Sequence, residues 1–166
     1  HKTLLQSVRG KNKMPGEYRM SQNWIGGATI DDAAFVPPIH TSVDELMSDL
    51  EKFANHESNP LPDLIKIAII HYQFESIHPF YDGNGRTSRL LMNYLQVYFG
   101  LPMCIVFKED KAADFEALQQ TRLKEDIAVF SNFMYGQYEK YLLLEIDKFE
   151  ALKKDEGKSG GYSFVF

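Results

Sequence analysis

The chain has 166 residues and one cysteine, and 18 basic against 23 acidic side chains give it a formal charge of −5. This length supports a single domain, and 44% hydrophobic residues supply enough apolar surface for one core. A lone cysteine forms neither an internal disulfide nor a cysteine metal cage, and a mildly acidic chain lacks the basic stripe of a general nucleic-acid binder. No run approaches the ~20 apolar residues of a membrane span, and no signal peptide is recognisable. We therefore expect a cytoplasmic protein that binds neither nucleic acid nor membrane.

The N-terminal part is predicted to contain little regular structure. Residues 1–5 resemble the last turns of a helix, so we expect the natural protein to continue upstream. Residues 18–39 interleave isolated apolar side chains with paired glycines at 26–27 and paired prolines at 37–38. This composition suits a short β-hairpin or loop better than a helix, and we call residues 18–39 the flap.

The rest of the core, about residues 40–152, is predicted to be helical. Apolar side chains recur at helical spacing over residues 42–53, 63–77, 86–98, 111–124 and 127–152, and residues 153–166 read as a loop-like tail. The helix over 63–77 is apolar on nearly all sides and should be buried at the centre. Pro79 excludes α geometry at His78 and so ends that helix. The sequence thus predicts one all-α domain over residues 1–166, a helical bundle around a central helix, with a hairpin flap.

The segment His-Pro-Phe-Tyr-Asp-Gly-Asn-Gly-Arg-Thr-Ser-Arg, residues 78–89, lies between the central helix and the next one. Gly83 and Gly85 permit positive φ and Asn84 tolerates it, so successive backbone N–H groups can turn toward one anion. The following helix adds its N-terminal N–H groups and its dipole at the same place. This loop predicts a nest for phosphate.

Charged side chains around this loop support a phosphate site. Arg86 and Arg89 lie at a helix N-terminus, where cations are unfavourable unless an anion compensates them. Asp82 is compatible with phosphates when Mg²⁺ lies between them. His78, with an ordinary pKa of about 6.5, can take a proton from a hydroxyl. A Gly-Asn-Gly turn or paired arginines alone are commonly structural, and it is their combination with a histidine and an aspartate that favours phosphate chemistry.

Residues 78–89 resemble the signature of Fic domains, His-Pro-Phe-x-Asp-Gly-Asn-Gly-Arg-x-x-Arg, at every fixed position. The likeness continues in Gly16-Glu17-Tyr18-Arg19, Trp24-Ile25-Gly26-Gly27, Phe35-Val36-Pro37-Pro38 and Leu90-Leu91-Met92-Asn93, and so covers nearly the whole chain. It implies a mainly helical fold. It also implies transfer of AMP from ATP to a Ser, Thr or Tyr hydroxyl of a target protein or of the domain itself, with release of pyrophosphate.

The resemblance also implies roles for individual residues. His78 is the catalytic base, Asp82 is the Mg²⁺ ligand, and Phe115 lies near the adenine. Five residues bind the phosphates: Gly83, Asn84, Gly85, Arg86 and Arg89. Three flap residues position the target segment by strand-like backbone pairing: Trp24, Ile25 and Gly26.

One family feature is missing, and some alternatives stay open. Many Fic proteins carry an inhibitory motif Ser/Thr-x-x-x-Glu-Gly/Asn; Thr121 and Glu125 have this spacing, but Asp126 follows them. We therefore expect an inhibitory segment or antitoxin outside this fragment. The alternatives are Fic-type transfer of another phosphate-containing group, removal of AMP, or a non-catalytic nucleotide-binding module. The identity of the target and the formation of a homo-oligomer are also left open.

Overall fold

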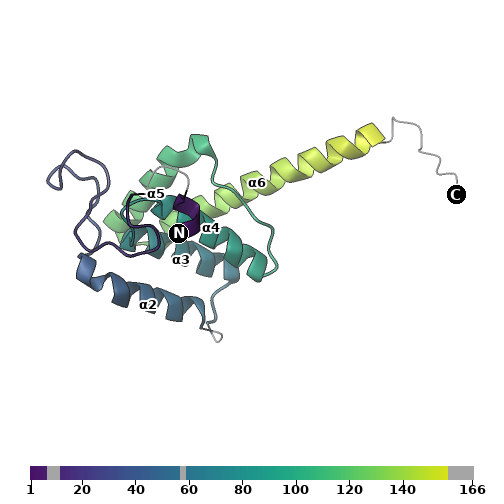
Figure 1. The fold of residues 1–166 in the computed structure, drawn as a ribbon. Coiled ribbons are helices and arrows are strands. Elements are labelled where there is room, and N and C mark those ends of the chain that lie inside the picture. The colour runs from purple at the N-terminus through teal and green to yellow at the C-terminus, as the bar shows by residue number, and fades with distance from the viewer. Residues whose placement is uncertain (7–11, 57–58, 157–166) are drawn as a thin grey trace.

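The computed structural model describes residues 1–6, 12–56 and 59–156 of the chain (Figure 1). This described part is built from helices, which confirms the predicted all-α bundle. In chain order the elements are α1 (Lys2–Leu5), η1 (His40–Ser42), α2 (Val43–Ala54), α3 (Asp63–Ile77), α4 (Asn84–Tyr98), η2 (Lys108–Asp110), α5 (Lys111–Lys124) and α6 (Ile127–Glu156), where η denotes a short 3₁₀ helix.

The hairpin predicted in the flap is reduced to one antiparallel bridge. The Ile25 N–H donates to the Phe35 carbonyl at 2.8 Å, and the Phe35 N–H donates to the Ile25 carbonyl at 3.1 Å. Beyond the bridge, Gly26 and Gly27 have φ values of 71° and 72°, and on its other side two prolines lack an N–H donor. The ladder therefore cannot lengthen, and the flap is a loop pinned at one pair rather than a β-hairpin.

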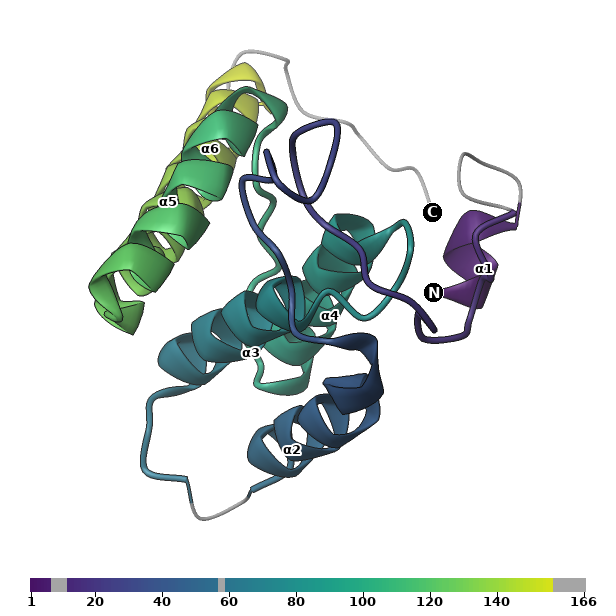
Figure 2. The same cartoon turned by 90° about the vertical axis from the view of Figure 1, so that its left-hand side faces the viewer.

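Helix α3 is the central element, as its apolar sequence predicts. Helices α2, α4 and α6 pack against it, while α5 packs along α6 (Figure 2). The buried apolar side chains of α3 are Ile67, Ala68, Ile70, Phe74 and Ile77. The end of this rigid helix therefore determines where His78, the next residue, is placed.

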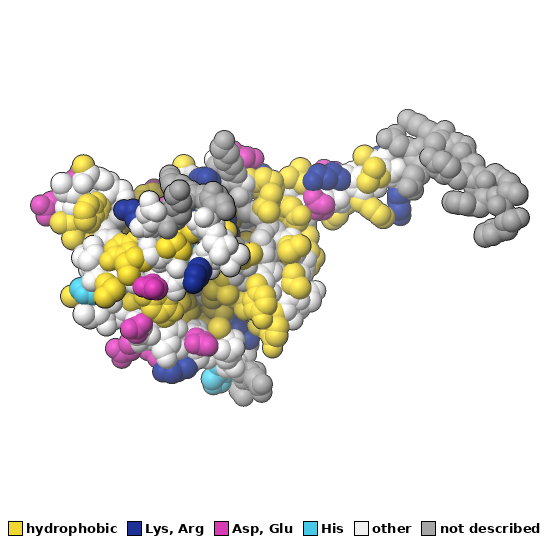
Figure 3. Space-filling view, viewed as in Figure 1, with side chains coloured by type: hydrophobic (Ala, Val, Ile, Leu, Met, Phe, Trp, Pro, Cys, Tyr) yellow, Lys and Arg dark blue, Asp and Glu magenta, His cyan; other side chains and the backbone are white. Residues whose placement is uncertain are grey.

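Helix α6 is the longest element, and its end differs from the prediction. It runs through Gly136 to Glu156, so residues 153–156 are helical instead of belonging to a loop-like tail; residues 157–166 lie outside the described residues. Alanine, leucine and lysine near this end are good helix formers, which explains the extension. The distal part projects from the body and carries exposed apolar side chains at Leu143, Leu144, Ile146, Phe149 and Leu152 (Figures 1 and 3). No helix in the described ranges has both the length and the apolarity of a membrane span.

Candidate functional site

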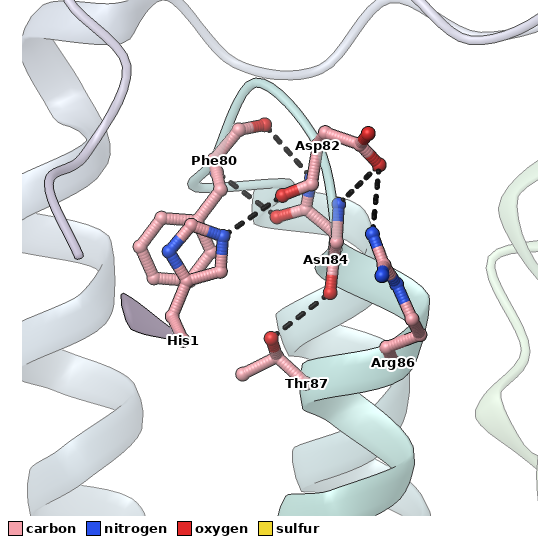
Figure 4. Close-up of polar contacts among 7 residues, drawn as sticks. His1, Phe80, Asp82, Asn84, Arg86 and Thr87 are labelled. Atoms are coloured by element: carbon pink, nitrogen blue, oxygen red, sulfur yellow. Dashed lines mark hydrogen bonds and ion pairs between the residues drawn. The ribbon is translucent and has the colours of Figure 1, made fainter. Parts of the chain in front are cut away.

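The loop between α3 and α4 is shaped by the side chain of Asn84. Its Oδ1 accepts a hydrogen bond from the Phe80 N–H at 2.9 Å, and its Nδ2 donates to the Phe80 carbonyl at 2.8 Å (Figure 4). Asn84 is 2% exposed, so this side chain faces into the loop. Because the side-chain amide of Asn84 closes the loop, Asn84 can bind a phosphate through its backbone N–H.

The start of α4 has the features of an anion site. Gly83 precedes the helix with a φ of 83°, and its carbonyl accepts from both the N–H and the Oγ1 of Thr87, each at 2.9 Å. The N–H groups of Asn84 and Gly85, in the first helical turn, have no acceptor within the helix. A Cβ on Gly85 would lie 3.4 Å from both Glu75 Oε1 and Arg89 Nη1. The start of α4 therefore lies close to Glu75 of α3 and to Arg89, the second arginine of α4 itself.

His78 is held in the left-handed region, with a φ of 51°, as the residue that ends α3. Its Nδ1 lies 3.4 Å from the Glu75 carbonyl oxygen. The pKa of the His78 imidazole is lowered to about 4, mainly by burial and also by the charges of Arg19 and Arg122, while the Glu75 carbonyl and Asp82 oppose the shift. The ring is thus neutral at neutral pH. When Nδ1–H points to the Glu75 carbonyl, Nε2 carries the lone pair that can accept a proton.

Arg19 fixes the backbone at this position. Its Nε donates to the His78 carbonyl at 3.0 Å and its Nη2 donates to the Ile77 carbonyl at 3.4 Å, while its backbone N–H donates to the Pro79 carbonyl at 2.8 Å. Nη2 also contacts the Pro38 carbonyl at the other end of the flap. The guanidinium thereby satisfies carbonyls at the C-terminus of α3, where a cation is favourable. Sequence reasoning placed Arg19 in the family-like segment but assigned it no role.

His1 supports the loop from the other side. Its ring stacks on Phe80, with centroids 3.6 Å apart and planes at 5°. Nδ1 accepts from the Gly16 N–H at 2.8 Å, so the proton is on Nε2, which donates to the Asp82 carbonyl at 2.9 Å (Figure 4). No pattern in the sequence indicates a contact between residues so far apart along the chain.

Asp82 and Arg86 form a pair at the start of α4. Asp82 Oδ1 accepts from the Gly83 N–H at 2.6 Å and lies 3.4 Å from Arg86 Nη2 (Figure 4). The anion expected to compensate Arg86 is therefore in part this neighbouring carboxylate. Among the described residues, 1–6, 12–56 and 59–156, no group of three or more His, Cys, Asp or Glu side chains is placed to hold a metal ion. One carboxylate beside a phosphate nest fits Mg²⁺ that takes its other ligands from phosphate oxygens and water.

Two partly buried acids, Glu75 and Asp114, lie near Arg89, and sequence reasoning missed both. Ser88 Oγ donates to Glu75 Oε1. Burial raises the pKa of Glu75 and of Asp114, while the positive charge of Arg89 lowers both. An acid in the second half of the largely apolar α3, three residues before His78, was the available signal for Glu75. Phe115 follows Asp114 on α5 and is half-buried, and its contact with adenine stays a prediction.

The flap lies next to the loop. Asn23 Nδ2 donates to the Phe80 carbonyl at 3.3 Å, and the next residue, Trp24, is 42% exposed. Both backbone groups of Ile25 are used in the bridge to Phe35. Trp24 precedes the bridged residue, whereas Gly26, which follows it, has a φ of 71° and does not continue an extended edge. The structure thus brings the predicted flap residues to the loop that carries His78.

Comparison with known proteins agrees with the resemblance seen in the sequence. Residues 1–96 match the Fic/DOC family. The chain is 38% identical over 128 residues to the protein adenylyltransferase Fic of Drosophila grimshawi, and 37% identical over 128 residues to that of Drosophila melanogaster. These alignments cover 76% of the chain but 25% and 24% of the two relatives, so the chain spans about a quarter of their length.

Solved structures show the same fold. A Fic domain containing signaling protein from Bacteroides thetaiotaomicron has a TM-score of 0.75 at 26% identity, and the match covers 98% of this chain and 64% of that one. A Fic family protein from Desulfovibrio desulfuricans G20 has a TM-score of 0.74 at 26% identity, covering 89% of this chain and 45% of that one. The predicted fold class and the resemblance over nearly the whole chain are confirmed.

Proposed function

The chain belongs to the Fic/DOC family, and we propose that it is a protein adenylyltransferase domain. It transfers AMP from ATP to a Ser, Thr or Tyr hydroxyl of a target protein or of itself, and it releases pyrophosphate. The observation that carries this proposal is a half-buried, neutral imidazole at residue 78 placed just before a loop that opens into a helix N-terminus. The relatives named for this activity are about four times longer than the part that matches this chain. The activity of the whole protein is therefore proposed here together with that of the domain.

His78 acts as the general base. Its neutral Nε2 takes the proton of the target hydroxyl, the hydroxyl oxygen forms a bond to the α-phosphorus of ATP, and the bond from that phosphorus to the pyrophosphate oxygen breaks. A positioned base of this kind contributes roughly 10²–10⁴ in rate. Arg19 and the Glu75 carbonyl keep the ring in place, because they hold its backbone and its Nδ1 respectively.

The start of α4 holds the triphosphate. The negative charge that moves onto pyrophosphate is balanced by the side chains of Arg86 and Arg89 and by the backbone N–H groups of residues 84–85. Gly83, whose own N–H bonds to Asp82, supplies the turn that orients them. Asp82 is the residue that would hold Mg²⁺, and the ion, when bound, would supply positive charge beside the phosphates. Phe115 on α5 contacts the adenine.

The flap positions the target. With the backbone of Ile25 engaged by Phe35, the backbone groups of Trp24 pair with an extended target segment, and the positive φ of Gly26 turns the flap away after them. The side chain of Trp24, partly exposed beside the loop, contacts the residue to be modified.

The regulator and the compartment are part of the same proposal. We place the inhibitory segment or antitoxin outside residues 1–166, since the sequence motif of that segment is missing here. We propose a cytoplasmic location. The one cysteine, Cys104, is a buried free thiol, which suits a reducing compartment.

ATP that carries an isotope label on one chosen phosphate tests the reaction. ATP labelled on the α-phosphate should mark protein in a lysate, or the domain itself, whereas γ-labelled ATP should not. His78→Ala should reduce labelling by at least about 100-fold and leave ATP binding within about two-fold, because the base is not needed to hold phosphate. His56→Ala, at an exposed position after α2, is the matched control and should label normally.

Three outcomes would contradict the proposal. Label from the γ-position would mean phosphorylation. Label from neither position, with ATP bound, would favour a nucleotide-binding module. Undiminished labelling by His78→Ala would remove His78 as the base.

A further inference from the structure

Arg122, on α5, contacts the flap through a ring. Its guanidinium carbon lies 3.5 Å from the centroid of the Phe35 ring, a stacked cation–π arrangement. Phe35 is the flap residue whose backbone is bridged to Ile25. The contact therefore acts on the single pair that gives the flap its shape.

The other side of the same guanidinium faces the helix that carries the base. Arg122 Nη2 lies 3.4 Å from Ser76 Oγ, two residues before His78. Burial lowers the pKa of the Arg122 guanidinium, while Tyr72 and Glu75, also on α3, favour its charged form. Its Nε is buried and has no hydrogen-bond partner among the described residues. Arg122 thus lies between α3 and the flap, and neither the family signature nor the proposed mechanism uses it.

The other contacts hold the flap at its base. Arg19 donates to the carbonyls of Ser21 and Pro38, near the two ends of the flap, and Gln22 Nε2 donates to the Pro37 carbonyl at 2.9 Å. These bonds fix where the flap leaves the body but not the angle of the bridge above it. The stack of Arg122 on Phe35 connects the bridge itself to α5 and α3.

We propose that Arg122 is a positioning residue that holds the flap against the helix presenting His78. By fixing Phe35, it fixes the bridged Ile25, and with it the adjoining Trp24 and Gly26, relative to the imidazole. A guanidinium suits this role because its planar face stacks on the ring while its edge donates to Ser76. The catalytic part of this inference rests on the proposed AMP transfer, whereas the structural part does not.

Trp24 allows the structural part to be tested without any activity. It is the one tryptophan in the sequence and lies next to the bridge, so its fluorescence reports on the flap. Arg122→Gln and Phe35→Leu should each raise acrylamide quenching of Trp24 by about two-fold, and the double variant should add little, because both changes remove one contact. Arg122→Lys, which keeps the charge without the planar face, should give an intermediate value. Lys140→Gln is the matched control. Lys140 makes the same kind of contact with another ring, because its Nζ lies 4.4 Å from the centroid of Phe107, which is not a flap residue.

Self-labelling tests the catalytic part. With α-labelled ATP at saturation, Arg122→Gln and Phe35→Leu should lower the labelling rate by about ten-fold and leave the dissociation constant for ATP within about two-fold, because the phosphate loop is untouched. If the wild-type chain does not label at all, the proposed function fails, but the Trp24 experiment still decides the structural part.

The outcomes that overturn the inference are specific. Unchanged Trp24 quenching in a folded Arg122→Gln or Phe35→Leu protein contradicts it, and so does an equal loss of labelling in Lys140→Gln. Far-UV circular dichroism verifies folding. Phe35→Leu keeps the test valid if Arg122→Gln does not fold, because it changes the half-buried flap side of the contact.

Discussion

His78 combines a backbone conformation and a protonation state that both depend on its neighbours. A non-glycine residue in the left-handed region costs about 1–2 kcal/mol, and Arg19 offsets this by bonding to the carbonyls of Ile77 and His78. Burial keeps the imidazole neutral, which is the form that a general base needs. The position is thus strained and desolvated, as is common where a fold prepares a reactive group.

The lowered pKa of His78 predicts an unusual pH dependence. The labelling rate should stay nearly constant as the pH falls through 6.5 and should drop only toward 4, where the imidazole becomes protonated. Between these values the unfolded chain binds a proton that the folded chain does not, so the unfolding free energy decreases as the pH falls across this window. His71, whose pKa burial also lowers to about 4, adds to this loss. Rates measured between pH 4 and 8, with folding verified by circular dichroism at each pH, test the prediction; a midpoint near 6.5 would contradict it.

At the scale of elements, the junction of α3 and α4 is where local sequence and packing meet. Pro79 ends α3, Gly83 starts α4 with a positive φ, and Asn84 ties the two ends of the intervening loop together. The flap depends on packing in a different way. Arg122 of α5 stacks on Phe35 of its one bridge, and Asn23 beside the bridge bonds to the Phe80 carbonyl of the loop, so its geometry depends on elements outside the flap.

A pair of glycine substitutions tests the junction. Gly83→Ala should lower the unfolding free energy by about 1–2 kcal/mol, because the position has a φ of 83° and a Cβ would lie 3.2 Å from Leu5. Gly136→Ala should instead raise it by about 0.5–1 kcal/mol, since that site is helical and a Cβ meets open space. Urea denaturation measures both. Equal effects of the two variants would show that backbone conformation is not what distinguishes the sites.

At the scale of the whole molecule, α6 has two parts with different surroundings. Phe130, near its start, is 0% exposed and packs against His71 and Tyr72 of α3. Phe149, near its end, is 58% exposed on the part that projects from the body. The core therefore includes only the first part of this helix.

Two alanine variants measure this division. Phe130→Ala should lower the unfolding free energy by about 3–5 kcal/mol, because it removes a fully buried ring and leaves a cavity. Phe149→Ala should change it by less than about 0.5 kcal/mol, since little is buried there. Thermal and urea unfolding of both proteins provide the values. A large loss with Phe149→Ala would mean that the projecting part of α6 is held by contacts beyond those described.

The features that the sequence alone determined are local ones. The central helix, the stop at Pro79 and the glycines of the loop follow from periodicity and turn chemistry within a few residues, and the signature that indicates the family spans residues 78–89. The flap, for which the sequence left a short hairpin or a loop open, is a loop with one antiparallel bridge, because short alternating runs do not show whether a ladder can lengthen.

What only the tertiary structure decided is the environment of these local features. The neutral state of His78 comes from burial, the capping by Arg19 joins residues 59 apart, and the bond from His1 to the Asp82 carbonyl joins residues 81 apart. Such contacts depend on how the helices pack, and a sequence pattern carries no information about the distance between two distant side chains or the water they lose on folding. For this reason the chain alone suggests His78 as the candidate base, but the groups that position it could not be predicted.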